Sequence, residues 1–406
     1  MKIGKPELLS EMNKKLILDY LRKEGPKSRA DVKRKLGLSF PTVSTNVKDL
    51  IEGNMILEIG ISDNAMGRKG TLLKFNSKMG YVLGIDMGRS HIRMMICDIS
   101  GDVICSSVSD QFTQKTTQGV LDQIDDEFER ILQKGCISKN NLLYISIGIP
   151  GIVDEIEGKH RLAPFIEIFK DIRIDTYMRE KYQIKTLCGN SVDFGAIGEK
   201  WKGAGKEYKN IIYLDYGIGI GCSLILNGEL YTGRNGAAGE VGYMLPGIQF
   251  ERYEYDEEGV MEKLIAGSEL EKRMITQNNL PYTSIKELFE RDIEGQFVGS
   301  ELILEIKKYI GILLVNLVSI INPEVIIIGG GIGKQLALKY ADYFEHYLRA
   351  YVPYVPQIVP TKLDDKANLL GAVAYALRNI HEEYASLEAI NMQNLATIPN
   401  EVKVII

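Results

Sequence analysis

The stretch that decides the fold is Tyr81-Val82-Leu83-Gly84-Ile85-Asp86-Met87-Gly88, an apolar strand that ends in an Asp-x-Gly turn. Strands over 92–97 and 103–108, separated by a turn, follow it. The same order returns later, where a strand over 211–214 ends in Asp215-Tyr216-Gly217-Ile218-Gly219 and precedes strands over 222–226 and 230–231. A hairpin used twice in this way indicates an internal duplication.

Two lobes, each with three meandering strands followed by crossover helices, predict an α/β body like that of actin, hexokinase and Hsp70. This is the duplicated ribonuclease H-like fold of ATPases and sugar kinases, with a cleft between the lobes. The glycine-rich run at 326–333, after a long predicted helix, supports the same fold. In such hairpins, glycines let backbone N–H groups approach nucleotide phosphates. The loop residues expected at the cleft are Asp86, Gly88, Gly217, Gly219 and Gly330.

Charge is distributed unevenly along the 406 residues, whose formal net charge is -5. Residues 1–78 contain 16 Lys and Arg against 9 Asp and Glu, whereas the remainder contains 33 against 45. A basic head on an acidic body indicates that the head, and not the body, meets a polyanion, because phosphate backbone repels an acidic surface.

Residues 1–78 contain three predicted helices in the order of a helix-turn-helix. Ser28 and Asp31 form a capping box at the start of the second helix, and Gly37 ends it. Ser39 caps the third helix, whose face opposite the apolar stripe carries short polar side chains and a cation. Such a face suits the major groove of DNA, although a plain solvated face explains it equally well. The candidate DNA-binding residues on it are Ser39, Thr42, Ser44, Thr45, Asn46 and Lys48.

The next segment predicts a β-hairpin, with strands over 55–59 and 71–75 around a glycine-flanked basic tip. Arg68 and Lys69 at this tip can lie along the DNA backbone or in a narrow minor groove. Three helices and a basic wing make a winged helix-turn-helix, and we expect it to bind double-stranded operator DNA. The alternative is a winged-helix module used for protein contacts.

Cysteine spacing and the start of the chain give no sign of export. The five cysteines form no C-x-x-C pair, so neither a zinc knuckle nor a disulfide framework is expected. The first residues lack the apolar core of a signal peptide, and the longest apolar stretch, 310–333, is interrupted by polar residues. We therefore expect a cytoplasmic protein with no membrane partner.

Four motifs extend the pattern to nearly the whole chain: Gly84-Ile85-Asp86-Met87-Gly88, Gly148-Ile149-Pro150-Gly151, Gly217-Ile218-Gly219-Ile220-Gly221 and Ala238-Gly239-Glu240-Val241-Gly242. With the head, they resemble the ROK family of repressors and kinases. Within that family the chain is similar to the repressors of the xylose and N-acetylglucosamine type, because the sugar kinases lack a DNA-binding head.

The resemblance implies that catalysis is lost. Family kinases have Asn-Asp where this chain has Asn190 and Ser191, and the Asp removes the proton from the attacking sugar hydroxyl. Serine cannot act as a general base at neutral pH, and Asp193 faces another way on its helix. Arg89 and Tyr216 replace small loop residues of the kinases, so we also expect no tight ATP binding. The protein is thus predicted not to be an enzyme.

The family zinc site is missing its ligands. The resemblance places a histidine directly after Ala-Gly-Glu-x-Gly and three cysteines beyond it, but this chain has Tyr243 at the first position and no Cys or His from 244 to 261. Zinc needs nitrogen or sulfur ligands at fixed reach. We therefore expect no metal and no other cofactor.

The sugar-reading carboxylates are retained. In the family they hydrogen-bond sugar hydroxyls, which suits ionised acceptors because each can accept from two neighbouring hydroxyls. Tyr243, in place of the sugar-binding histidine, leaves the identity of the sugar open. The candidate sugar-binding residues implied by the resemblance are Gly151, Asn190, Ser191, Glu240, Tyr243 and Glu262.

We therefore expect three parts: a head at 1–78, a first lobe at 79–195 completed by a C-terminal helix at about 368–406, and a second lobe at 196–367 with a dimerisation surface. The favoured function is a sugar-released transcriptional repressor that binds its operator as a dimer or tetramer. Two alternatives stay open: a sugar kinase with an incidental head, and a DNA-binding protein whose body is a dimerisation module with an empty cleft.

Overall fold

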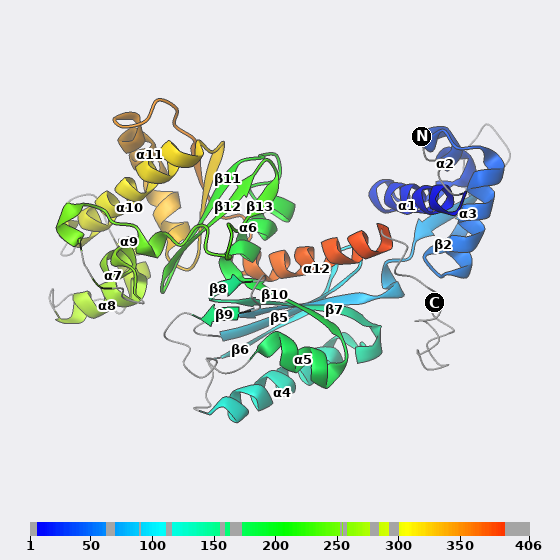
Figure 1. Cartoon of the computed structure of the whole chain (residues 1–406), viewed down its shortest axis with the longest axis horizontal. Coiled ribbons are helices and arrows are strands. Elements are labelled where there is room, and N and C mark those ends of the chain that lie inside the picture. The colour runs from blue at the N-terminus through cyan, green and yellow to red at the C-terminus, as the bar shows by residue number, and fades with distance from the viewer. Residues whose placement is uncertain are drawn as a thin grey trace.

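The structure is a computed structural model of the chain. It describes residues 6–61, 70–88, 91–110, 116–154, 159–162, 173–251, 254, 258–276, 284–291 and 300–385. Figure 1 shows a small head that stands apart from two larger α/β lobes.

The head contains three helices against a small antiparallel sheet of order β1-β3-β2. The predicted capping box is present, because Ser28 Oγ accepts from Asp31 N at 3.2 Å and Ser28 N donates to Asp31 Oδ2 at 3.1 Å. Ser39 Oγ likewise accepts from Thr42 N at 3.2 Å and starts α3. The head consists of α1 (Pro6–Glu24), β1 (Lys27–Ser28), α2 (Arg29–Leu36), α3 (Phe40–Glu52), β2 (Ile56–Ile61) and β3 (Thr71–Phe75).

The two lobes have the same strand topology, which confirms the predicted duplication. In the first sheet, of order β10-β7-β4-β5-β6, β4 pairs antiparallel with β5 and parallel with β7. In the second, of order β13-β12-β11-β14-β15, β11 pairs antiparallel with β12 and parallel with β14. The strands are β4 (Tyr81–Met87), β5 (His91–Asp98), β6 (Val103–Asp110), β7 (Leu142–Ile149), β10 (Lys185–Asn190), β11 (Ile211–Tyr216), β12 (Ile220–Leu226), β13 (Glu229–Tyr231), β14 (Val325–Gly329) and β15 (Gln357–Pro360).

Helices cover both faces of each sheet, and the helices that lie between the two sheets join the lobes. On the outside, α4 (Thr117–Gly135) and α5 (Ile174–Tyr182) pack on the first sheet. The second sheet is covered by α7 (Val260–Ile265), α8 (Gly267–Thr276), α9 (Ile285–Arg291), α10 (Ser300–Ile321) and α11 (Gly333–Arg349). A two-stranded ribbon of β8 (Gly151–Asp154) and β9 (Lys159–Leu162) lies beside the first sheet.

Two helices, α6 (Ser191–Lys202) and α12 (Ala367–Ala385), cross between the lobes. Glycines make this crossing possible, because a Cβ at Gly198 would overlap Ala367 O and a Cβ at Gly371 would overlap Phe194 O. The predicted lobe boundary at 195/196 therefore falls inside α6. The C-terminal helix lies on the first sheet, and residues 386–406 of its predicted range are outside the described residues.

The head is joined to the body by apolar contacts. Phe75 packs against both the head core and the cluster that α12 forms with the first sheet. Figure 1 shows α12 running from between the lobes toward α1, and the two helices are in contact. One helix therefore reaches from the inter-lobe region to the head.

Candidate functional site

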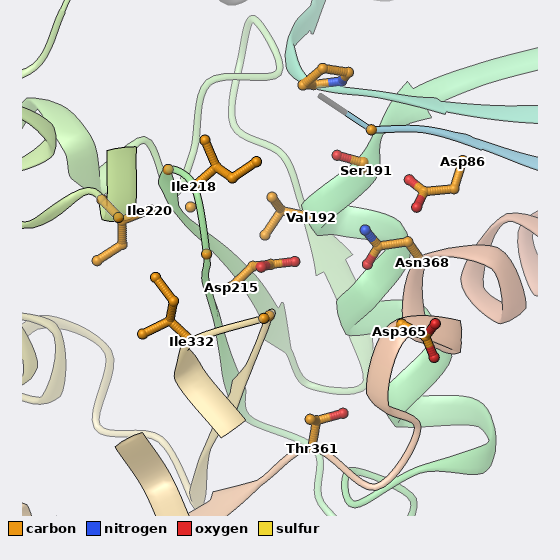
Figure 2. A pocket seen from close by; sticks show the side chains of 18 of the residues that line it. Asp86, Ser191, Val192, Asp215, Ile218, Ile220, Ile332, Thr361, Asp365 and Asn368 are labelled. Carbon is orange, nitrogen blue, oxygen red and sulfur yellow. The ribbon is translucent and has the colours of Figure 1, made fainter. Parts of the chain in front are cut away.

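A cavity of about 640 Å³ lies between the two lobes. Its lining comes from both Asp-x-Gly hairpins, the start of α6, the first turn of α11 and the segment that joins β15 to α12. In Figure 2, Ile218, Ile220 and Ile332 form one wall, and Asp86, Asp365 and Asn368 lie on the opposite side. An apolar wall facing polar groups suits a ligand with both C–H surface and hydroxyls.

Ten of the eleven residues predicted for the cleft line this cavity. They are the sugar candidates Gly151, Asn190, Ser191, Glu240 and Glu262, and the loop residues Asp86, Gly88, Gly217, Gly219 and Gly330. The exception is Tyr243, which is 38% exposed in a turn at Val241–Tyr243 and is not among the lining residues. Its contact with a sugar stays a prediction, whereas Glu240, three residues earlier, lines the cavity.

Asn190 holds the start of α6 in place. Its side-chain oxygen accepts from Val192 N at 2.7 Å, and its amide donates to Gly151 O at 2.9 Å. This N-cap satisfies an otherwise unpaired helix donor and fixes the Gly151 loop at the same time. Ser191, the first residue of the helix, has its side chain on the Asp86 side of the cavity (Figure 2).

Asp193, two residues farther along α6, accepts a hydrogen bond from Ser223 Oγ at 2.6 Å. It is not among the residues that line the cavity. The expectation that Asp193 does not take the place of a catalytic base at Ser191 is consistent with this contact, because its carboxylate is held by β12.

The two hairpin aspartates, Asp86 and Asp215, form an acidic pair across the lobes. Burial raises the pKa of Asp86 to about 6, and Arg93 opposes that shift. Burial and then the Asp86 carboxylate raise the pKa of Asp215 to about 6. Arg93 Nη1 lies 3.5 Å from Asp86 Oδ2, and Arg93 Nη2 lies 3.6 Å from Asp365 Oδ2. One cation thus serves two carboxylates, and Asp86 Oδ1 is buried with no hydrogen-bond partner.

Glu240 and Glu262 form a second acidic pair. Burial raises the pKa of Glu240 to about 7, and the charges of Glu262 and Asp193 add to the shift. Glu240 is held by the turn at Val241–Tyr243, and Glu262 lies in the first turn of α7. Both carboxylates line the cavity, where they can accept hydrogen bonds from hydroxyl groups.

Close backbone packing shapes the second hairpin. Gly330 has φ +83°, and a Cβ there would overlap Asp215 Oδ1. The first residues of α8 bind the hairpin from behind, because Gly267 N and Ser268 N donate to Gly217 O and Ile218 O, both at 3.1 Å. The side chain of Tyr216, one of the two residues expected to hinder ATP binding, is fully buried in the core of the second lobe, and the expectation of no tight ATP binding stays a prediction.

The segment between β15 and α12 is tied to both lobes. Glu199 of α6 is fully buried, and Lys362 N and Leu363 N each donate to its Oε1 at 3.1 Å. Asp364 pairs with Lys334 of the second lobe, whereas Asp365 faces Arg93 of the first. A change in the angle between the lobes therefore alters contacts at the start of α12.

The polar groups of this segment and Arg93 were not predicted from the sequence. A single charge inside the apolar run from Ile92 to Cys97 was the available signal, because a charge in a buried strand needs a partner. Nothing in the sequence placed Asp364, Asp365 or Asn368 at the cavity.

In the head, the outward face of α3 differs in part from the prediction. Thr45 and Lys48 are exposed, and Ser44 is partly so. Asn46 is only 3% exposed: its side chain accepts from Ser10 Oγ at 2.8 Å and donates to Thr42 O at 2.8 Å. The prediction that Asn46 contacts DNA is therefore wrong, because its amide joins α1 to α3. Arg68 and Lys69 lie outside the described residues.

Two further features concern metals and membranes. In the described part of the chain, no group of three or more His, Cys, Asp and Glu side chains is arranged to hold a metal ion. The absence of zinc stays a prediction. Among the described helices, none combines the length and the apolar character that crossing a bilayer requires.

In the comparison with known proteins, a family model matches the body, and a curated relative matches both the head and the body. The model of the ROK family matches residues 82–379. The chain belongs to the ROK family. Among its curated relatives, the xylose repressor of Caldicellulosiruptor bescii is 28% identical over 405 residues, which cover 94% of this chain and 100% of the relative.

Solved structures of ROK proteins show the same fold. The crystal structure of a ROK family transcriptional regulator, a homologue of the E. coli MLC protein, has a TM-score of 0.75 at 19% identity and covers 94% of this chain and 99% of its own. The ROK hexokinase from Thermus thermophilus has a TM-score of 0.62 at 26% identity, and covers 74% of this chain and 99% of its own. The body is therefore an actin-like, sugar-kinase-like pair of sheets.

Proposed function

We propose that this protein is a sugar-responsive transcriptional repressor. The observation that carries the proposal is the combination, in one chain, of a basic three-helix head and an acid-lined cavity. A relative named a xylose repressor matches this chain over the whole of its own length. The hexokinase match covers only 74% of this chain although it covers nearly all of the hexokinase. The head is thus an addition to a sugar-binding body.

The head is proposed to be a winged helix-turn-helix that binds double-stranded operator DNA. Its order of α1, α2 and α3 followed by a two-stranded hairpin supports this assignment. The exposed lysines and arginines of α2, together with Thr45 and Lys48 on α3, would meet phosphates and base edges.

The effector is proposed to be an uncharged sugar. Seven carboxylates line the cavity against three Lys or Arg side chains, and all three cations, Arg93, Lys286 and Lys334, already pair with acids. A negatively charged sugar phosphate would meet repulsion there. Carboxylates such as Glu240 and Glu262 instead suit hydroxyl groups, and Ile218, Ile220 and Ile332 suit the C–H face of a sugar ring.

The body is proposed to have no kinase activity. Phosphoryl transfer needs a base beside the attacking hydroxyl, and Ser191 stands at that position by resemblance to the family. Tight ATP binding and zinc are not expected either. A coupled ADP-release assay with xylose, glucose and N-acetylglucosamine tests this, and turnover with any of them would favour the alternative of a kinase with an added head.

The mechanism proposed is lobe closure passed to the head through α12. The start of α12 is bound to both lobes, and its far end contacts α1. A sugar that binds the closed form more tightly shifts the lobes, and the shift changes the position of the heads. A homodimer or dimer of dimers in the cytoplasm would present two heads to a palindromic operator.

An operator-release experiment tests the whole proposal. The full-length protein is incubated with a random-sequence duplex library, and the enriched duplex is used in a mobility-shift assay with each sugar titrated in. We expect enrichment of one palindromic sequence and release by at least one sugar. A failure to enrich any duplex contradicts DNA binding, whereas enrichment without release by any sugar contradicts induction and leaves the empty-cleft alternative.

A further inference from the structure

We infer that Phe40, the first residue of α3, reads the methyl group of a thymine in the major groove of the operator. This inference rests on the proposed function, because it needs the head to bind DNA through α3. Phe40 is 50% exposed, although a phenyl ring in a folded head would ordinarily be buried. Its place at the start of the helix is the part of a recognition helix that meets base edges.

The polar groups beside Phe40 are engaged within the head. Ser39 Oγ and Thr42 Oγ1 are 2.7 Å apart and hydrogen-bond to each other, and Ser39 Oγ also accepts from Thr42 N at 3.2 Å. Asn46 is buried against α1. Lys48 lies two turns farther along and is 3.7 Å from Glu52. At the start of α3, the phenyl ring is thus an exposed apolar group beside polar groups that already have partners inside the head.

An aromatic ring can distinguish bases by one feature of the major groove. It neither donates nor accepts conventional hydrogen bonds, so it cannot read the amino, carbonyl or ring-nitrogen groups of the bases. The C5-methyl group of thymine is the apolar feature that the groove presents, and phenylalanine is among the residues that contact it. Contact with that methyl would bury part of the exposed ring on binding.

Electrostatics around Phe40 favour DNA as its partner. The neighbouring helix α2 carries Lys33, Arg34 and Lys35 on its exposed surface, and residues 1–78 carry an excess of positive charge. A phosphate backbone drawn to these cations would lie beside α3, because α2 and α3 pack against each other. An apolar protein surface would gain nothing from this charge.

The test removes only the methyl group. In the operator enriched by the full-length protein, each thymine is replaced in turn by deoxyuridine, and affinity is measured for the wild type and for Phe40→Ala. We expect the operator affinity of the wild type to fall about four-fold when the thymine at one position of the half-site is replaced, which is the effect of burying one methyl group. Phe40→Ala should bind the unmodified operator more weakly and should not respond to deoxyuridine at that position.

A matched control keeps the result interpretable. Leu16→Ala truncates an apolar side chain of α1 that is 46% exposed, and it should retain the deoxyuridine effect of the wild type. Circular dichroism of each variant checks that the head is folded. Equal sensitivity in Phe40→Ala, or a wild type indifferent at every thymine, overturns the inference while operator binding itself still stands. A failure to enrich any duplex is instead the failure of the proposed function.

Discussion

In the cavity, a carboxylate that we propose to bind the sugar also carries a cost in stability. Glu240 is partly buried near Glu262, and its pKa is raised from 4.5 to about 7 by burial first and by neighbouring charges second. An acid whose pKa is higher in the folded state binds more protons there than in the unfolded state. Its contribution to stability therefore falls as pH rises from about 4.5 to about 7, and remains unfavourable above that range.

Replacing Glu240 by Gln should separate these two effects. Sugar affinity should fall about ten-fold or more, because a charged acceptor is lost. As pH rises from 5 to 8, the free energy of unfolding of the variant should increase relative to that of the wild type. Urea denaturation at both pH values measures this. The exposed Glu251→Gln should change neither quantity, and a pH-independent difference for Glu240→Gln would contradict the assignment.

Gly330 and Gly331 are adjacent glycines whose replacement by alanine should have different effects. Gly330 has φ +83° and faces the Asp215 carboxylate, so Gly330→Ala should lower stability by about 1–3 kcal/mol and weaken sugar binding. A Cβ at Gly331 meets open space, so Gly331→Ala should have little effect on stability. Thermal unfolding with and without sugar compares the two. Equal melting temperatures for both variants would argue against the close approach of Gly330 to the hairpin.

At the scale of elements, α3 has an inner and an outer face, and the pattern of polar residues in the sequence did not fully separate the two. The exposed positions Pro41, Thr45 and Lys48 follow helical spacing, and Asn46 lies on the other side of the helix. Its hydrogen bonds to Ser10 and Thr42 fix the angle of α3 against α1. The orientation of α3 against α1 therefore depends on a side chain that is buried inside the head.

Two neighbouring substitutions distinguish these faces. Asn46→Ala leaves Ser10 without its partner in a partly buried site and should destabilise the head by about 1–3 kcal/mol. Thr45→Ala should leave stability within about 0.5 kcal/mol and should weaken operator binding. Chemical denaturation and a mobility-shift assay on each variant give both readouts. A stable Asn46→Ala protein with specifically altered base preference would restore Asn46 as a DNA contact.

On the scale of the whole molecule, the cavity and the head are connected by one continuous path. Glu199, Asp364 and Asp365 bind the start of α12 to both lobes, and Phe75 packs against both the head core and the cluster that α12 forms with the first sheet. In the proposed function, the body contributes the ligand site and the head the DNA site. Coupling between them is a property of the contacts at the two ends of α12.

Phe75→Ala should uncouple the two sites. We expect sugar affinity to stay within about two-fold of the wild type, because Phe75 is not among the residues that line the cavity. The ratio of operator affinities without and with sugar should shrink, since one apolar contact between the head and the cluster of α12 and the first sheet is lost. Phe75→Leu, which keeps an apolar side chain, serves as the control. An unchanged ratio in Phe75→Ala would show that coupling takes another route.

The sequence alone determined the elements whose signals are local. Capping at Ser28 and Ser39, the two Asp-x-Gly hairpins and the repeated strand order all follow from residues close together in the chain, and the structure contains them. Ten of the 31 residues that line the cavity could also be predicted, because motif glycines and acids mark the ends of strands and the starts of helices.

Only the tertiary structure decided which side chains face which partner. The side chain of Tyr216 lies in the core, that of Asn46 bonds to α1, and Tyr243 is not among the cavity-lining residues, although each is close in sequence to a residue that was predicted for a site. Arg93 and Asp365, separated by most of the chain, meet because the final helix returns to the first sheet. Side-chain direction and long-range pairing depend on how elements pack, and packing energy is shared among residues that no local pattern connects.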